Sequence, residues 1–316
     1  MKLKFGILGA GHIAGKMAKT LDFLRDEVEP YAVASREFDR AEALRASCGF
    51  ARAYGSYGEL LADKAVDVIY VATPNHLHRD HALACVAAGK HVVCEKPFAL
   101  SVAEAREVFD AARAGGVFVM EALWTRFQPA VRLIREVIDS GEIGEVRFAE
   151  GAFGLAISHK ERIVRREMGG GAILDLGIYP LNFVDMFLGI GDDCAISPTV
   201  TRLESGADDQ TALALRWPDG RMASVLCSAT AAMGAWGRIA GTLGHIEVPA
   251  LSRCEGFTVR KVPSNEERKV VCPFDFNGYE YEIRAAARAI GEGRLEPPEM
   301  PWAATLNILR VMEPLW

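Results

Sequence analysis

A glycine-rich turn near the N-terminus constrains the fold of this chain more than any other feature. Residues 5–8 form a strand candidate, and the pattern Gly9-x-Gly11-x-x-Ala14 follows directly, ahead of a helical pattern over residues 16–24. Between a strand and a helix this spacing is typical of a dinucleotide-binding loop. Gly9 permits the tight turn, Gly11 lets the backbone approach a pyrophosphate, and Ala14 keeps the helix close to the strand. The alternative is a glycine-rich turn without a ligand.

Apolar runs alternate with helical patterns over the first 120 residues, and Ser101 with Glu104 predicts a capping box at the start of one helix. This alternation predicts a doubly wound parallel sheet, a Rossmann fold, for residues 1–120. From residue 121 on, several segments alternate in the manner of antiparallel strands, and Asp219-Gly220 is a hairpin turn between two of them. The sequence therefore predicts an α/β protein with a second domain over residues 121–316.

The end of the second predicted strand indicates which dinucleotide binds. A site that prefers NAD places an Asp or Glu there for the ribose hydroxyls, but this chain has Ser35-Arg36. A serine hydroxyl and a planar guanidinium suit a 2′-phosphate, because the guanidinium can hold phosphate oxygens or stack on the adenine. We therefore expect NADP(H) in preference to NAD(H). The alternative is that Arg36 is a solvated loop residue.

Two further strand ends carry polar residues. Thr73-Pro74-Asn75 follows one apolar strand, with His78 three residues further on, and Glu95-Lys96-Pro97 follows another. Ligands bind at the carboxyl edge of an open parallel sheet, so both loops are expected beside the dinucleotide, and Lys96 is the strongest catalytic candidate. A structural ion pair between Lys96 and Glu95 is the alternative. The residues expected to bind the cofactor are Gly9, Gly11, His12, Ile13, Ala14, Ser35, Arg36, Thr73, Pro74, Asn75, His78, Glu95, Lys96 and Pro97.

A second glycine run, at residues 169–171, opens a helical pattern with two proton-transfer candidates. Asp175 and Tyr179 are four positions apart and are expected on one helix face, with Asn182 three further along. Pro180 cannot donate a backbone hydrogen bond and is expected to kink or split the helix nearby. A carboxylate and a phenol on an otherwise apolar segment could serve as acid and base. The alternative is a core aromatic residue beside a satisfied buried acid.

Composition argues against several classes of function. The net charge of -6 argues against nucleic acid or an anionic membrane as the main partner. The N-terminal apolar run is too short for a signal peptide, and no stretch approaches the roughly 18 uninterrupted apolar residues of a membrane span. Seven scattered cysteines fit neither a disulfide framework nor a zinc site, and His76, His78 and His81 lack a carboxylate or cysteine ligand at suitable spacing. We expect a cytoplasmic protein that binds no metal and acts on a small molecule.

Taken together, the motifs resemble the glucose-fructose oxidoreductase/inositol dehydrogenase/MocA family over nearly the whole chain. They are the fingerprint at 9–14, Ala72-Thr73-Pro74-Asn75 with His78, Glu95-Lys96-Pro97, and the glycine run 169–171 followed by Asp175, Gly177 and Tyr179. Residues 120–127 and 177–180 look most like the dihydrodiol dehydrogenase branch, whose members also oxidise aldoses such as xylose with NADP. The resemblance implies a C-terminal α+β domain on a large, mostly antiparallel sheet whose open face commonly forms a dimer interface. A homodimer or homotetramer is therefore expected.

The resemblance also implies a mechanism, reversible hydride transfer between NADP(H) and a carbinol carbon of a cyclic sugar, polyol or trans-dihydrodiol. Lys96 would hydrogen-bond the reacting oxygen and stabilise developing alkoxide, Tyr179 would pass the proton, and Asp175 would orient Lys96 or the substrate. Many members carry histidine at the position of Tyr179. A tyrosine has an intrinsic pKa of about 10 instead of about 6.5, so its phenolate needs stabilisation, which Lys96 could supply. Whether Lys96 or Tyr179 carries the proton stays open.

Three further residues, Trp124, Arg147 and Arg202, are candidates for the substrate pocket, with Trp124 as a floor for a ring-shaped substrate. A lone Trp is more often a packing residue and an Arg more often solvated, which is the alternative for each of them. Two other functions also fit the motifs. One is a non-catalytic, NADP-binding and sugar-responsive regulator, and the other is a reductase of a different carbonyl or imine substrate.

Overall fold

The computed structural model describes residues 2–316, which form two compact units. Unit 1 combines the residues up to Trp124 with Asp275–Thr305, and unit 2 combines Thr125–Phe274 with Leu306–Trp316. The predicted domain boundary between residues 120 and 121 stays a prediction. The sequence did not predict that Asp275–Thr305 belongs to unit 1. Two elements cross from one unit to the other along the chain, η2 (Trp124–Phe127) and α10 (Trp302–Met312).

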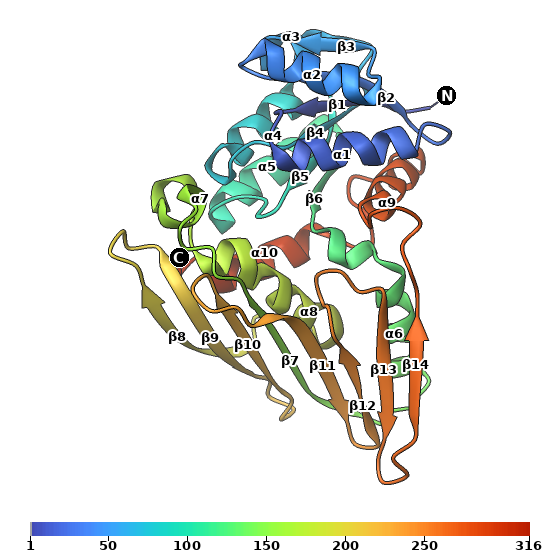
Figure 1. The fold of residues 1–316 in the computed structure, drawn as a ribbon, viewed down its shortest axis with the longest axis vertical. Coiled ribbons are helices and arrows are strands. Elements are labelled where there is room, and N and C mark those ends of the chain that lie inside the picture. The colour runs from blue at the N-terminus through green and yellow to red at the C-terminus, as the bar shows by residue number, and fades with distance from the viewer. Residues whose placement is uncertain (1) are drawn as a thin grey trace. The chain divides into compact units, whose positions relative to one another are not determined.

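Unit 1 is built on a parallel sheet of six strands in the order β3-β2-β1-β4-β5-β6 (Figure 1). This is a doubly wound order, which confirms the predicted Rossmann fold and places ligands outside the carboxyl ends of the strands. The central strands are apolar because helices cover both faces of such a sheet. The strands are β1 (Lys4–Leu8), β2 (Glu29–Ala34), β3 (Arg52–Tyr54), β4 (Val68–Val71), β5 (His91–Glu95) and β6 (Val119–Ala122).

Helices connect these strands, and one predicted cap is present in modified form. Ser101 Oγ accepts a hydrogen bond from Glu104 N at 3.1 Å, while the Glu104 side chain accepts one from Leu100 N at 2.9 Å. Sequence analysis missed β3 and the helix after it, because both are short and partly exposed. The helices are α1 (His12–Phe23), α2 (Phe38–Cys48), α3 (Tyr57–Ala62), η1 (Asn75–Leu77), α4 (His78–Ala87) and α5 (Val102–Gly115).

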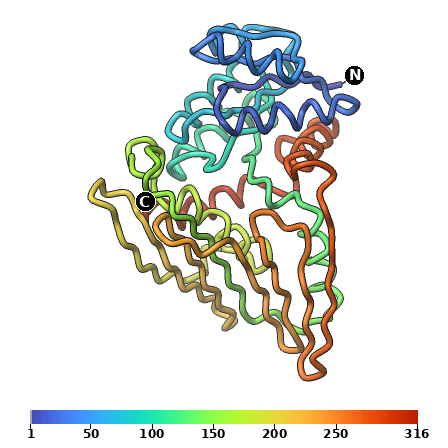
Figure 2. Tube along the Cα trace, in the orientation of Figure 1, coloured from blue at the N-terminus to red at the C-terminus, as the bar shows by residue number. Residues whose placement is uncertain are grey.

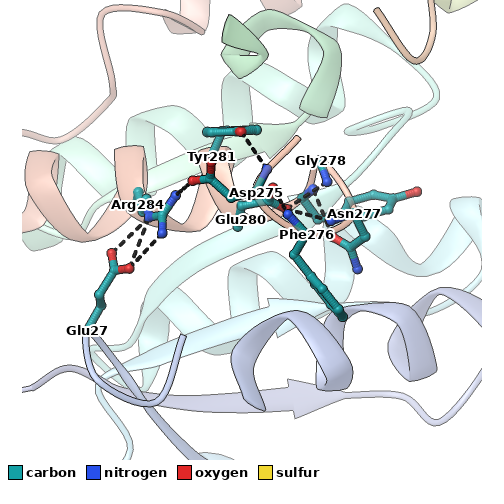
Figure 3. Close-up of polar contacts among 9 residues, drawn as sticks. Glu27, Asp275, Phe276, Asn277, Gly278, Glu280, Tyr281 and Arg284 are labelled. Atoms are coloured by element: carbon teal, nitrogen blue, oxygen red, sulfur yellow. Dashed lines mark hydrogen bonds and ion pairs between the residues drawn. The ribbon is translucent and has the colours of Figure 1, made fainter. Parts of the chain in front are cut away.

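The late segment of unit 1 contains α9 (Glu280–Gly291), which lies beside the end of α1 (Figure 2). Arg284 donates to both carboxylate oxygens of Glu27 and also to Asp275, as Figure 3 shows. Glu27 and Arg284 are 257 positions apart in the chain. This charged cluster therefore attaches the late segment to the turn between α1 and β2.

A buried glutamate shapes the turn that precedes α9. Glu280 is fully buried, and its side chain accepts hydrogen bonds from the backbone N–H groups of Phe276, Asn277 and Gly278 (Figure 3). Three donors compensate the carboxylate for its loss of water. The Asn277 side chain in turn donates to Thr20 Oγ1 at 2.9 Å.

Unit 2 is built on an eight-stranded sheet in the order β14-β13-β12-β11-β7-β10-β9-β8. Strands β7 and β10 pair in parallel, and the other neighbours are antiparallel, which confirms the large, mostly antiparallel sheet. The predicted Asp219-Gly220 turn joins β9 to β10, with Gly220 at φ 85°. The strands are β7 (Val146–Gly154), β8 (Ala195–Arg202), β9 (Asp208–Arg216), β10 (Met222–Ser228), β11 (Gly234–Gly241), β12 (Gly244–Val248), β13 (Gly256–Lys261) and β14 (Glu267–Val271).

One face of this sheet packs against α8 (Ile178–Leu188), which runs along β7, β10 and β11 (Figure 1). The longer helical stretch Arg166–Leu188 is long and apolar enough to cross a membrane, with a mean hydropathy of 1.3 over an 18-residue window, but 83% of that window is buried inside the protein. The core helix of a soluble protein has the same properties, so the stretch is weak evidence for a membrane span. The other helices of unit 2 are α6 (Pro129–Asp139), α7 (Glu161–Val164), η3 (Arg166–Met168) and the π-helical turn η4 (Ile173–Gly177).

Candidate active site

The turn after β1 has the backbone geometry that its glycines predicted. Gly9 adopts φ 115°, and a Cβ at this position would lie 2.7 Å from the carbonyl oxygen of Ala72 in the strand-end loop after β4. Gly9 N also donates to Ala34 O at 2.9 Å. Glycine is therefore required at position 9 for two reasons, its positive φ and the close approach of the loop after β4.

The N-terminus of α1 is open. Gly11 precedes the helix, no side chain of residues 2–316 caps it, and its first turn contains no acidic residue. No other part of the described chain lies within 4 Å of a Cβ built at Gly11. The first backbone N–H groups of a helix, here those of His12, Ile13 and Ala14, lack partners within the helix. This end of α1 therefore fits the pyrophosphate of a dinucleotide.

Polar groups that suit a 2′-phosphate follow β2. Ser35 is buried, and its Oγ accepts a hydrogen bond from Glu37 N at 3.2 Å, which leaves its hydroxyl hydrogen for a ligand. Arg36 is exposed. Arg40, which sequence analysis missed, donates from Nη2 to Ala10 O at 3.1 Å and so lies beside the glycine turn. Its position one helical turn after Arg36, at the start of α2, was the available signal.

His78 joins the two loops that were expected beside the cofactor. It is fully buried, with Nδ1 2.7 Å from Pro97 O and Nε2 2.8 Å from Thr73 O. Burial lowers the pKa of His78 to about 4, so the ring is neutral and one of its nitrogens donates. His78 therefore lies between the backbones of these two loops and donates a hydrogen bond to one of the two carbonyl oxygens.

The carboxylate before Lys96 is also buried. The Tyr70 hydroxyl donates to Glu95 Oε1, and Lys96 N donates to Glu95 Oε2 at 3.1 Å. Burial raises the pKa of Glu95, and the bonds from Tyr70 and Lys96 oppose that rise. Glu95 thus fixes the backbone of Lys96 at the end of β5.

A second buried glutamate supports the same loop from β6. Glu121 Oε1 accepts a hydrogen bond from Phe98 N at 2.9 Å, and Oε2 accepts one from Thr305 Oγ1 at 2.8 Å. Phe98 directly follows Pro97, so the loop is anchored on both sides of Lys96. Sequence analysis did not assign Glu121 this role.

In unit 2, each position of the run 169–171 requires glycine for a structural reason. Gly169 adopts φ 76° and Gly171 φ 121°, both unfavourable for residues with a Cβ. A Cβ at Gly170 would lie 2.6 Å from Arg165 O and 2.7 Å from Ile163 O. The Trp316 indole donates to Gly170 O at 2.7 Å. The run is therefore a tight turn that leads into η4.

Asp175 and Tyr179 are the partly exposed residues of an otherwise buried segment, residues 171–188. The predicted helix is divided: Asp175 lies in the π-helical turn, and Tyr179 lies in the first turn of α8. Pro180 also falls in that first turn, where a missing N–H costs little. Asp175 Oδ2 lies 2.5 Å from Arg162 Nη1, and the Tyr179 ring packs edge-on against Phe153 at 5.5 Å.

A buried polar network holds the rest of α8. Arg126 forms an ion pair with Asp185 in which both side chains are less than a tenth exposed. Arg126 Nε also donates to Asn182 Oδ1 at 2.5 Å, and Asn182 Nδ2 donates to Thr125 Oγ1 at 3.0 Å. Asn182 therefore uses its side-chain amide in hydrogen bonds to Arg126 and Thr125.

The three pocket candidates have different surroundings. Trp124 is 8% exposed and stacks on Tyr279, with ring centroids 4.4 Å apart. Arg147 is exposed and pairs with Glu145, and Arg202 donates to the carbonyl groups of Gly206 and Leu315. Their roles in substrate binding stay predictions, as do those of Lys96, Asp175 and Tyr179. Within residues 2–316, no group of three His, Cys, Asp or Glu side chains is placed to hold a metal ion.

Comparison with known proteins agrees with this geometry. Residues 3–123 match the model of an oxidoreductase family with an NAD-binding Rossmann fold, and residues 131–247 match the C-terminal domain of the same family. Trans-1,2-dihydrobenzene-1,2-diol dehydrogenase of Mus musculus is 36% identical over 99% of this chain and 96% of its own length.

Solved structures have the same fold. An aldose–aldose oxidoreductase of Caulobacter crescentus, in complex with glycerol, superposes with a TM-score of 0.89 at 25% identity, covering 100% of this chain and 96% of its own. A 3-ketoreductase of Actinomadura kijaniata, in complex with TDP-benzene and NADP, has a TM-score of 0.84 at 25% identity and covers 98% and 95%. With family matches in both units and a relative similar over almost its whole length, this chain belongs to the glucose-fructose oxidoreductase/inositol dehydrogenase/MocA family of NAD-binding oxidoreductases.

Proposed function

We propose that this protein is an NADP-dependent dehydrogenase that transfers hydride between nicotinamide and a carbinol carbon of a trans-dihydrodiol, cyclic polyol or sugar. The observation that carries the proposal is similarity to a dihydrodiol dehydrogenase over 99% of the chain. Sugars are included because an aldose–aldose oxidoreductase shares the fold over the whole chain. The NADP preference is supported by Ser35 and Arg36 directly after β2, by Arg40 beside the glycine turn, and by the NADP complex of a neighbouring ketoreductase.

Each candidate residue has one role in the proposed reaction. Bound NADP+ supplies the hydride acceptor. Lys96 donates a hydrogen bond to the reacting oxygen and stabilises the negative charge that develops on it. Tyr179, in its phenolate form, takes the proton that this oxygen loses, and Asp175 orients Lys96 or the substrate. The backbone around Lys96 is held by His78, Glu95 and Glu121, which fixes the position from which the Lys96 side chain extends.

The test is NADP+ reduction by the full chain against xylose, glucose, inositol and trans-dihydrodiols, followed by identification of the products. Lys96→Ala is expected to lower kcat by about a hundredfold, the usual cost of removing one group that stabilises a developing oxyanion. NADPH binding, followed by nicotinamide fluorescence, should persist in that variant. Near-normal turnover by Lys96→Ala contradicts its role, and a wild type without turnover on the whole panel favours a non-catalytic regulator.

We further propose a cytoplasmic homodimer or homotetramer without a nucleic-acid or membrane partner. All seven cysteines are buried free thiols, which suits a reducing compartment. Met222 and Leu226 of β10 and Trp236 of β11 are large apolar side chains exposed at 44%, 39% and 36%. Such side chains on one sheet suit contact with a second copy. Light scattering of the purified chain tests the oligomeric state.

A further inference from the structure

One buried carboxylate of unit 2 lies behind the segment that carries Asp175. Asp208 begins β9 and is fully buried. Its Oδ2 accepts a hydrogen bond from Ile173 N at 2.7 Å and one from Thr211 Oγ1 at 3.2 Å. Ile173 is the first residue of η4. Asp208 therefore supplies the acceptor for a backbone N–H at the start of the π-helical turn, where N–H groups lack a partner within the helix.

The other oxygen of this carboxylate is unsatisfied. Within residues 2–316, Asp208 Oδ1 is buried without a hydrogen-bond partner, and a Cβ at Gly171 would overlap it. Burial raises the pKa of Asp208 to about 6, and the bonds from Ile173 and Thr211 only partly oppose this. A buried acid with an unpaired oxygen costs stability. A local cost of this kind is expected where a residue serves a site instead of the fold.

We infer that Asp208 is a positioning residue that sets the orientation of Asp175 relative to Tyr179 by holding Ile173 N and fitting against Gly171. The inference rests on the proposed roles of Asp175 and Tyr179. One extra residue in a π-helical turn displaces the preceding residues by about 100° around the helix axis relative to a regular α-helix. Loss of the acceptor at Ile173 lets this turn relax toward α-helical register, which rotates Asp175 away from its present direction.

The main test compares Asp208→Ala with Asp208→Asn in the full-length protein. Asp208→Ala is expected to lower kcat about tenfold or more, because small misplacements of catalytic groups are costly, while KM for NADP+ stays unchanged. The solvent isotope effect on kcat should rise, because proton transfer becomes slower. Asp208→Asn should restore most of kcat, since its amide oxygen can accept from Ile173 N. Asp209→Ala is the matched control, because the neighbouring carboxylate accepts from Thr201 Oγ1 instead of from η4.

A second measurement does not depend on turnover. Hydrogen–deuterium exchange of the peptide over residues 171–179, followed by mass spectrometry, is expected to be faster in Asp208→Ala than in the wild type and Asp208→Asn. If Asp208→Ala does not fold, Thr211→Val removes one of the two donors to Oδ2 and is expected to change exchange and isotope effect in the same direction, by less.

The outcomes separate this inference from the proposed function. An active wild type whose kcat and isotope effect are unchanged by Asp208→Ala, or by Thr211→Val where that variant replaces it, overturns the inference and leaves the dehydrogenase proposal standing. A wild type without turnover overturns the dehydrogenase proposal. In that case unchanged exchange over residues 171–179 overturns the structural inference, and faster exchange supports it.

Discussion

Arg162 Nη1 lies 2.5 Å from Asp175 Oδ2, and this ion pair ties the short helix α7 to the π-helical turn. The two side chains differ in exposure, 51% for Arg162 and 16% for Asp175. The guanidinium therefore has a free side toward solvent, while the carboxylate is largely enclosed. Asp175 is held as an acceptor by a cation, which suits an orienting role in the proposed reaction better than the role of a proton donor.

Removal of Arg162 is expected to affect catalysis modestly. Because the arginine is half exposed, its pair with Asp175 is worth at most about 1 kcal/mol, so Arg162→Ala should lower kcat/KM about two- to fivefold. Arg165→Ala is the matched control, because Arg165 lies at the end of the same helix but pairs with Glu161. Steady-state kinetics of both variants check this. Equal losses in the two variants contradict a specific role for Arg162.

Arg162 also shows where sequence analysis reached its limit. It lies on a four-residue helix with no periodic pattern, and its partner Asp175 is 13 positions away. Pro180 indicated a disturbed helix nearby, but nothing in residues 173–177 indicated that the disturbance is a π-helical turn. The first N–H of this turn, that of Ile173, donates to Asp208, which is 35 positions later in the chain. Contacts of this kind depend on the tertiary fold, which local propensity does not encode.

The predictable features were those with local causes. The apolar strands β1, β4 and β5, with glycine or polar residues at their ends, indicated a parallel sheet and its ligand-binding edge, because both depend on residues close in the chain. The return of Asp275–Thr305 to unit 1 was not predictable, since the contact of Glu27 with Arg284 spans 257 positions. The sequence motif predicted His78 beside the cofactor. It did not predict that the ring lies between two loops, because that position involves a contact with the carbonyl oxygen of Pro97, 19 positions away.

Arg36, directly after β2, and Arg40, beside the glycine turn, are expected to set cofactor preference. Arg36→Ala should weaken NADP+ binding about tenfold or more while leaving NAD+ binding unchanged, because a charge-assisted bond to the 2′-phosphate is worth about 1.5–3 kcal/mol. Arg40→Ala should have the same sign. Arg45→Ala is the control, because this arginine of α2 pairs with Glu42. Cofactor titration checks the prediction, and a tenfold preference of the wild type for NAD(H) contradicts it.

The raised pKa of Asp208 predicts a pH-dependent effect on stability. Its folded-state pKa of about 6 exceeds the ordinary value of 3.8, so the folded protein binds more protons than the unfolded chain between these pH values. This residue's contribution to the free energy of unfolding is therefore largest below pH about 4 and falls as pH rises to about 6, by up to about 3 kcal/mol. Asp208→Asn lacks this loss, so its stability relative to the wild type should increase between pH 4 and pH 7. Urea denaturation at both pH values measures it, and a pH-independent difference contradicts the assignment.

His78 predicts the opposite slope over the same range. Burial lowers its pKa from 6.5 to about 4, so the unfolded chain binds the proton first as pH falls. The stability that the neutral ring contributes is complete above pH about 6.5 and is lost as pH falls toward 4, by up to about 3 kcal/mol.

His78→Gln removes this titration and keeps an amide that can donate to one of the two carbonyl groups. Its stability relative to the wild type should therefore increase as pH falls from 7 to 4.5, whereas that of Asp208→Asn should decrease. The two variants measured together under one set of conditions test both assignments, because a general acid effect on the denatured state would move them in the same direction. Slopes of the same sign would show that at least one of the two buried groups does not titrate as its surroundings indicate.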